Sequence, residues 1–473
     1  MSLAQDLKKF SQLKYHYIHN RFRSPLYTYL LWEGLVRHHN QDVSFDYQLN
    51  NMINLKNDLA VGKKEWDILV QAIEQELKND FQLFNDLLKQ SQQKNQQLLD
   101  QIMILQQKTN AENLAKFFQL TYEFGAFNIF TLLLEKNFEQ QLFTIIKKSF
   151  HKDQEKILLA LTTPQKPSII QQQELDLFRL ALIKNKTEQQ EEIEKHLEQY
   201  AWLKDTSMTG DYYTAAEIQE QLQKIQDPEA QIADYQAKIK EQKNDFEKYY
   251  QKLNKQEQKL VEILLESIFF RSWRTERFYY NAFLLTEVYQ KLAVNLGLDK
   301  YQDIFYLIPP EILSLLSATE KADQEIISQR KKGYVMLADE ENTRIYSGSA
   351  VEKFLAQVKV TETSVNNQSL KGSVAYQGKA QGPVCLVESK EDFSKITAGC
   401  ILVTKSTTPD YVPYLKMVRG IITDEGGITS HAAIISRELH IPCLIGTKNA
   451  TQILKSGQII ELNTDQGEII VKV

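Results

Sequence analysis

Residues 424–446 read DEGGITSHAAIISRELHIPCLIG, and this stretch decides the fold of the C-terminal region. The run GIIT just before it, residues 420–423, is rich in β-branched residues and lacks polar alternation, which predicts a strand buried on both faces. The Gly-Gly pair predicts a tight turn, and HAAIISREL, with Ala and Ile on one face, predicts a helix. His431 is therefore predicted to lie at or beside a helix start.

The predicted position of His431 matters because backbone N–H groups at a helix start lack intrahelical partners and, with the helix dipole, favour an anion. The same field disfavours imidazolium, so we expect a neutral, nucleophilic ring near neutral pH. Thr429 and Ser430 supply hydroxyls that can orient the ring or cap the helix. A neutral imidazole beside an anion site suits the formation of phosphohistidine, and a capping or packing role is the alternative.

Glycine usage divides the chain into two parts. Residues 372–473 contain ten of the 17 glycines and alternate short β-branched runs with turns, which predicts a compact α/β domain. Residues 1–371 contain the other seven and are rich in Gln, Lys, Glu and Leu, which are good helix formers. The predicted fold is multidomain, α plus α/β: a large helical body over residues 1–365, followed by a compact α/β domain over residues 366–473.

Helical spacing of apolar residues supports the helical body. The stripe from Ile232 to Ile263 recurs every three or four residues, and we expect a long helical hairpin around residues 183–265. The aromatic residues of segment 14–32 also recur at helical spacing, which favours a helix packed in a bundle over a single-strand nucleic-acid surface. The polar run TETSVNNQSLKG, residues 361–372, predicts a mobile linker.

Composition excludes several classes of protein. A net charge of −5 and a pI near 6.0 argue against a nucleic-acid partner. The three cysteines show no CxxC spacing, which argues against a disulfide framework or a zinc site, so we expect no metal site. No apolar run approaches the roughly 18 residues of a membrane span, and the N-terminal MSLAQDLKKF lacks a signal-peptide core. We therefore expect a cytoplasmic protein without a membrane partner.

The C-terminal motifs carry a resemblance. The run from TTPD through GGITSHAA to DQGEI, residues 407–469, resembles almost position by position the mobile phosphohistidine (swivel) domain of the phosphoenolpyruvate-utilising enzymes. That family includes phosphoenolpyruvate synthase, pyruvate phosphate dikinase and rifampin phosphotransferase. The resemblance implies that His431 is the phosphorylated catalytic residue. It also implies that the phosphate site is shaped by Gly426, Gly427, Thr429 and Ser430, with Arg437 as a candidate acceptor or phosphate contact.

A weaker resemblance covers parts of the helical body. EQYAWL (198–203), RSWRTERFYYNAFLLTEVYQKLAVNLG (271–297) and DIFYLIPPEIL (303–313) are similar to the helical region that precedes the swivel domain in rifampin phosphotransferase. There the helical part contributes to binding the phosphoryl acceptor. The resemblance makes Arg271, Arg274 and Arg277 further candidate contacts for acceptor or phosphate. The alternative is a solvated helix face near Glu276.

Complete enzymes of this family also carry an ATP-grasp domain, for which the sequence offers no pattern. The glycines of residues 1–371 are isolated, and neither a P-loop nor a βα repeat of barrel length occurs there. We expect no cofactor bound by a motif of this chain, with ATP and Mg²⁺ acting through a separate ATP-grasp nucleotide-binding partner. The expected function is that of a phosphotransferase subunit with a small-molecule acceptor. The alternatives are a protein phosphocarrier, like the first enzyme of the sugar phosphotransferase system, and a non-catalytic regulatory protein.

Overall fold

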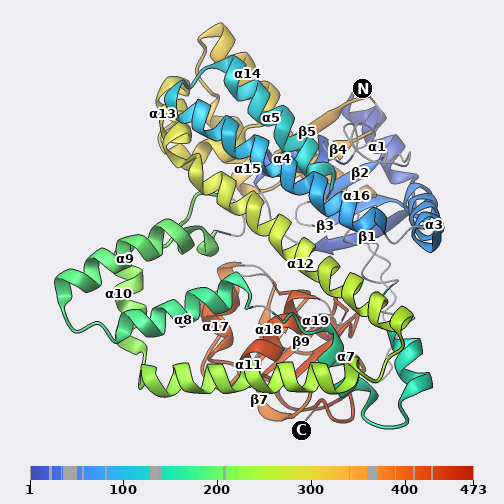
Figure 1. The fold of residues 1–473 in the computed structure, drawn as a ribbon. Coiled ribbons are helices and arrows are strands. Elements are labelled where there is room, and N and C mark those ends of the chain that lie inside the picture. The colour runs from blue at the N-terminus through green and yellow to red at the C-terminus, as the bar shows by residue number, and fades with distance from the viewer. Residues whose placement is uncertain are drawn as a thin grey trace. The chain divides into compact units, whose positions relative to one another are not determined.

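The computed structural model describes residues 2–20, 24–33, 35, 51–55, 58–79, 82–127, 138, 141–165, 167–205, 209–339, 341–359, 370–388, 390–407, 411–427 and 430–471. Its elements group into two compact units, and the chain passes between them several times (Figure 1). Unit 1 comprises Met1–Leu134, Ser207–Gly210 and Phe270–Thr363. Unit 2 comprises Glu135–Thr206, Asp211–Phe269 and Ser364–Val473.

This division differs from the predicted one at residue 365, because residues 135–269 group with the C-terminal domain. Helical periodicity shows that a segment has an apolar face, but it does not show which partner covers that face. Most of the predicted linker 361–372 lies outside the described residues.

Unit 1 is mostly helical, and its described residues also contain a five-stranded antiparallel sheet in the order β1-β3-β2-β4-β5. Its strands are β1 (Tyr15–Asn20), β2 (Met52–Leu55), β3 (Asp58–Gly62), β4 (Tyr334–Ala338) and β5 (Thr343–Ser347). Its helices are α1 (Leu3–Ser11), α2 (Pro25–Glu33), α3 (Lys63–Asn79), α4 (Gln82–Gln107), α5 (Ala111–Ala126), α13 (Thr286–Leu296), η3 (Tyr301–Tyr306), α14 (Pro309–Ala318), α15 (Gln324–Lys332) and α16 (Ser349–Gln357). The helix α12 (Lys255–Leu284) begins in unit 2 and ends in unit 1.

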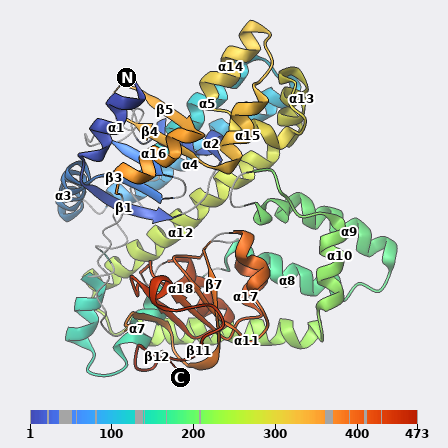
Figure 2. The same ribbon diagram turned by 180° about the vertical axis from the view of Figure 1, so that it is seen from behind.

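The predicted helix over segment 14–32 is wrong for its first part, where β1 pairs with β3. Tyr15, Tyr17 and Ile18 are residue types with high β propensity, and pairing with a neighbouring strand overrides the helical spacing of the aromatics. The run GYVMLADEENTRIYSG, residues 333–348, predicts the short hairpin that β4 and β5 form, whereas β1, β2 and β3, each only four to six residues long, escaped sequence analysis. Helices α1 and α16 lie beside β4 and β5 (Figure 2), and Phe10, Val335 and Phe354 share their core.

A buried charge network joins α1 to the hairpin of β4 and β5. Asp6 is fully buried and accepts hydrogen bonds from Nε and Nη2 of Arg344 at 2.8 and 3.0 Å and from the hydroxyl of Tyr346. Asp339 accepts from Nη2 of Arg344 at 2.7 Å and from Nζ of Lys9 at 2.9 Å. Burial acts to raise the pKa of Asp339, but the hydrogen bonds from Arg344 and Lys9 outweigh it and hold that pKa well below its ordinary range.

We expect Arg344→Met to lower the free energy of unfolding of this unit by about 2–4 kcal/mol, because it leaves two buried carboxylates without their shared cation. Lys63→Met is the matched control, since the Lys63–Asp67 pair is half exposed and such pairs contribute roughly 0–1 kcal/mol. Urea unfolding followed by circular dichroism measures both variants. Equal, small losses in the two variants would show that the network does not stabilise the fold.

The same network makes the stability of the fold depend on pH in the acid range. Because the pKa of Asp339 is lower in the folded than in the unfolded state, its stabilisation is complete above about pH 4 and is lost as the pH falls through the folded-state pKa. The stability difference between wild type and Arg344→Met should therefore shrink below about pH 4.

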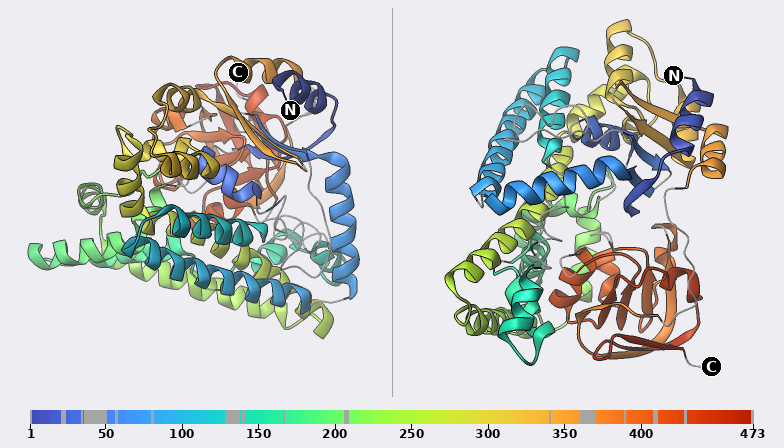
Figure 3. Two further views of the ribbon diagram at one scale, coloured as in Figure 1. Left: turned by 90° about the horizontal axis from the view of Figure 1, so that it is seen from above. Right: turned by 90° about the vertical axis from the view of Figure 1, so that its right-hand side faces the viewer.

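In the described part of unit 2, seven strands form a mixed sheet in the order β12-β11-β7-β8-β9-β10-β6, drawn in orange and red in Figure 3. The strands are β6 (Ser373–Tyr376), β7 (Lys379–Val387), β8 (Ile401–Thr404), β9 (Gly420–Thr423), β10 (Cys443–Ile445), β11 (Ile459–Asn463) and β12 (Glu468–Val471). Strands β7 to β10 are parallel, and the others pair antiparallel. Both β8 and β9 are buried at every residue, as their apolar runs predicted. The short helices η4 (Lys390–Lys395), α17 (Val412–Leu415), α18 (His431–Leu439) and α19 (Ala450–Ile453) connect the strands.

The remaining helices of unit 2 precede this sheet in sequence: α7 (Gln154–Thr162), α8 (Ile169–Ala181), α9 (Lys186–Tyr200), η2 (Ala201–Lys204), α10 (Ala215–Lys224) and α11 (Pro228–Tyr250). Helices α8, α9 and α10 share an apolar core that includes Leu177, Ile193 and Ile218. Helix α11 packs against α7 and α8. The sequence predicted a long helical hairpin around residues 183–265. In the structure this region contains α9, η2, α10, α11 and the first part of α12, which form a series of helices.

Candidate functional site

His431 is the first residue of α18, the helix start that the sequence predicted. Ser430 caps the helix, because its Oγ accepts a hydrogen bond from the backbone N–H of Ala433 at 3.3 Å. The backbone N–H of Ser430 donates to the carbonyl of Gly427 at 2.9 Å. These bonds fix the position at which the helix begins, and with it the backbone of His431.

Gly426 lets the turn before α18 approach its capping residue. Its φ of +112° is a conformation that side chains other than glycine rarely adopt, and a Cβ atom there would lie 2.7 Å from Oγ of Ser430. Asp424, two residues before Gly426, is buried and accepts hydrogen bonds from Thr447 Oγ1 at 3.0 Å and from both the backbone N–H and the hydroxyl of Thr451. The turn between β9 and α18 is therefore fixed by the hydrogen bonds of Asp424 before it and by the Ser430 cap after it. The predicted site residue Thr429 lies outside the described residues.

Thr407 is a site residue that sequence analysis did not single out. It is 4% exposed, and its Oγ1 lies 2.8 Å from Nδ1 of His431. The two residues follow β8 and β9, neighbouring parallel strands whose carboxyl ends meet at the same edge of the sheet. That topology, applied to the TTPD block, is the signal that could have identified Thr407.

The contact with Thr407 bears on which nitrogen can react. When Nδ1–H donates to the threonine hydroxyl, the lone pair of the neutral ring of His431 lies on Nε2. Nε2 itself is buried. The arrangement provides an imidazole at a helix start that is oriented through its Nδ1 contact with Thr407.

The structure does not bring Arg437 to the phosphate site predicted around His431. Arg437 lies in the last turn of α18, six residues after His431 and therefore about 9 Å farther along the helix axis. It is buried, and its Nε donates to the carbonyl of Ala375 on β6 at 3.3 Å.

The three predicted arginines Arg271, Arg274 and Arg277 belong to α12 in unit 1, whereas His431 belongs to unit 2. Arg274 is buried, and its Nη1 donates to the carbonyl of Phe127 at 3.3 Å, next to the end of α5. A cation at the carboxyl end of a helix stabilises that helix. Arg274 therefore has a structural role and does not lie on a solvated helix face, which was the alternative that the sequence left open.

Within the described ranges, no three His, Cys, Asp or Glu side chains gather as a metal site, and no helix is long and apolar enough to cross a membrane. All three cysteines are buried and free of disulfide bonds. Burial raises the pKa of Cys443 to about 12, which disfavours its thiolate.

Comparison with known proteins identifies relatives of the C-terminal part of the chain, which contains α18 and its neighbouring strands. Residues 396–467 match the family described as "PEP-utilising enzyme, mobile domain". Over 108 residues the chain is 49% identical to a probable phosphoenolpyruvate synthase of Methanothermobacter thermautotrophicus, a match that covers 22% of this chain and 16% of the relative.

Two further relatives come from Bacillus. The uncharacterized phosphotransferase YvkC of Bacillus subtilis is 31% identical over 261 residues, covering 48% of this chain and 31% of the relative. The rifampicin phosphotransferase of Bacillus cereus is 29% identical over 194 residues, covering 41% of this chain and 22% of the relative. The chain spans less than a third of the length of each of these three relatives.

A match over 261 residues cannot lie within residues 366–473 alone, so the similarity to YvkC extends into the helices that precede the sheet. The family match is confined to the segment that contains β8, β9 and α18. The resemblance inferred from the TTPD and GGITSHAA blocks is thereby confirmed. The C-terminal part of this chain is a mobile domain of the phosphoenolpyruvate-utilising enzyme family.

Proposed function

We propose that this chain is a phosphotransferase component that carries a phosphoryl group on Nε2 of His431 and passes it to a small-molecule acceptor. The observation that carries the proposal is the imidazole at the first position of α18, with Nδ1 held 2.8 Å from Thr407 Oγ1. This contact favours attack through Nε2, and the helix start provides a positive field for the phosphoryl oxygens.

The proposed reaction has two transfers. In the first, the bond between phosphorus and the donor oxygen breaks as Nε2 bonds to phosphorus, and the leaving group keeps the electron pair. In the second, an acceptor oxygen attacks phosphorus, the P–N bond breaks with its electrons returning to Nε2, and the acceptor proton passes to solvent. The His431 ring is neutral again at the end of the cycle.

The donor and the acceptor require further components. We propose that an ATP-grasp nucleotide-binding protein charges His431 with ATP and Mg²⁺ in trans, and that the cycle takes place in the cytoplasm. The names of the relatives include phosphoenolpyruvate synthase and rifampicin phosphotransferase, which indicate phosphoryl transfer but different acceptors. The proposed acceptor is therefore a small molecule, bound by the predominantly helical residues before 365. Arg271 and Arg277 remain candidate contacts there.

Peptide mapping tests the carrier role. After charging with labelled ATP and the ATP-grasp protein, the label should be lost in mild acid and retained in base, as expected for phosphohistidine. Mass spectrometry under alkaline conditions should locate it in the peptide that contains His431. Label that survives acid, or that maps to another peptide, would contradict the proposal.

We expect Thr407→Val to slow phosphorylation of His431 about tenfold, because it removes the hydrogen bond that orients Nδ1, worth roughly 0.5–1.5 kcal/mol. Thr407→Ser keeps the hydroxyl and should stay within about threefold of wild type. The initial rate of label incorporation measures both variants. A purely structural role would be indicated if the valine variant were labelled at the wild-type rate.

A further inference from the structure

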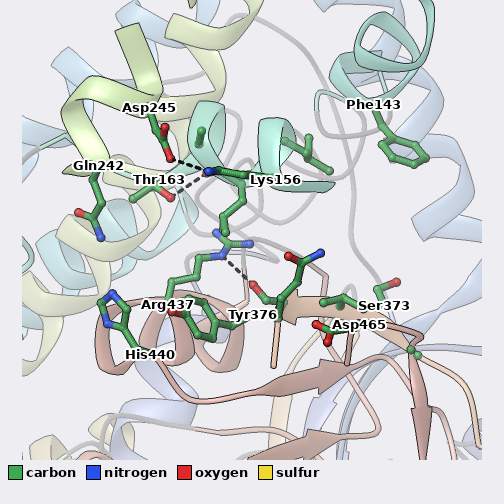
Figure 4. A pocket seen from close by; sticks show the side chains of 18 of the residues that line it. Phe143, Lys156, Thr163, Gln242, Asp245, Ser373, Tyr376, Arg437, His440 and Asp465 are labelled. Carbon is green, nitrogen blue, oxygen red and sulfur yellow. Dashed lines mark hydrogen bonds and ion pairs between the residues drawn. The ribbon is translucent and has the colours of Figure 1, made fainter. Parts of the chain in front are cut away.

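A second site lies in unit 2 at the other end of α18. It is a cavity of about 790 Å³ walled by α7, α11, β6, the C-terminal end of α18 and the turn between β11 and β12 (Figure 4). Cavities of about 300–1,000 Å³ hold small organic ligands. Neither His431 nor Thr407 lines this cavity, so it is distinct from the phosphohistidine site.

Two cationic side chains enter the cavity from opposite walls. Figure 4 shows Lys156 on the α7 side and Arg437 on the α18 side. Arg437 is only 5% exposed, and its bond to the Ala375 carbonyl fixes the guanidinium in the wall. A guanidinium held in this way presents donors in a planar fork that matches a carboxylate or phosphate group.

The side chain of Lys156 is 51% exposed, and its Nζ lies 3.4 Å from Oδ2 of Asp245. Because this ion pair is long and solvated, it contributes little to the stability of the fold. The ammonium group can therefore contact a ligand with little loss of stability. The pKa of Lys156 is raised, chiefly by the charge of Asp245, so the amine is protonated at neutral pH.

The rest of the lining is mixed. Its further charged side chains are Lys238, Lys371, Glu241 and Asp465. Lys238 pairs at 2.8 Å with Asp234, which is not part of the lining. Apolar surface comes from Leu158, Val374 and Tyr376, and the Tyr376 ring lies edge-on to His440 at 5.4 Å. The cations of the lining can therefore bind an acidic group of a ligand. The aliphatic and aromatic side chains of the lining can contact the apolar part of the same ligand.

We propose that this cavity binds a small amphipathic organic anion. Its carboxylate or phosphate group lies between Arg437 and Lys156, and its apolar body lies against Leu158, Val374 and Tyr376. The site does not require phosphorylation of His431, so it can be tested on the chain alone.

The test compares two probes that share one ring system: the anion 8-anilinonaphthalene-1-sulfonate and the neutral N-phenyl-1-naphthylamine. Fluorescence titration should show saturable, one-to-one binding of the anion to the wild-type chain. Arg437→Gln should weaken that binding at least tenfold and Lys156→Gln about fivefold, whereas the control Lys379→Gln, on β7 and outside the lining, should leave it within twofold. The neutral probe should respond to none of these changes.

Because Arg437 is buried, its variant is first checked by thermal unfolding. Should it fail to fold, Lys156→Glu provides the charge reversal at an exposed position and should abolish binding of the anionic probe. Competition with benzoate and with phenyl phosphate identifies the acidic group, and displacement by either supports the site. No saturable binding, unchanged affinity in the Lys156 variants, or failure of both competitors would overturn the proposal.

Discussion

Replacing His431 with alanine should abolish acid-labile phosphorylation under conditions that label the wild-type chain. The expected loss is complete because no other group at the start of α18 supplies a nitrogen nucleophile. The fold should survive the change. Alanine is the best helix former, and the cap formed by Ser430 with the Ala433 N–H does not involve the imidazole.

The matched control is His440→Ala at the other end of the same helix. His440 is the residue after α18, where its ring packs against Tyr376, so its loss should leave the rate and extent of labelling unchanged. Measurement requires labelled ATP with the ATP-grasp protein, acid and base treatment of the product, and thermal unfolding of both variants. Acid-labile phosphate on a folded His431→Ala chain would show that another histidine is the carrier.

Local signals were sufficient for the helix that carries the candidate site. The Gly-Gly turn, the capping serine and the apolar pattern of HAAIISREL predicted a helix over residues 431–439, and α18 has the same bounds. Each of these signals acts within a few residues of the chain: glycine allows the φ of the turn at Gly426, and Ser430 satisfies an N–H of the first helical turn.

Features that depend on distant partners escaped sequence analysis. Thr407 lies 24 positions before His431, and only the pairing of β8 with β9 brings the two together. Arg437 belongs to the same motif as His431, yet the rise of the helix places it in the wall of a different cavity. The sheet of unit 1 joins β2 to β4, strands about 280 residues apart, and no local pattern records such a pairing.

The 473-residue chain incubated with Mg²⁺ and ATP should remain unlabelled, and labelling should begin when an ATP-grasp protein is added. Phosphoryl transfer from ATP needs metal ions and cationic groups arranged around the transferred group, and a histidine nucleophile alone does not provide them. The seven glycines of residues 1–371 are isolated, and no glycine-rich loop that could cover the phosphates occurs among them. The acceptor nitrogen is therefore present in a chain that shows no recognisable nucleotide cradle.

The effect should be all or none, because the uncatalysed reaction of ATP with imidazole is negligible beside an enzymatic one. The experiment compares γ- and β-labelled ATP, with and without the ATP-grasp protein, and uses His431→Ala with the added protein as the control for label on other residues. In a second arm, labelled phosphoenolpyruvate replaces ATP. This arm shows whether the phosphoryl donor is ATP or phosphoenolpyruvate. Stoichiometric labelling of His431 by ATP in a preparation free of other proteins would show that the helices themselves contain a nucleotide site, and the trans-acting partner would be unnecessary.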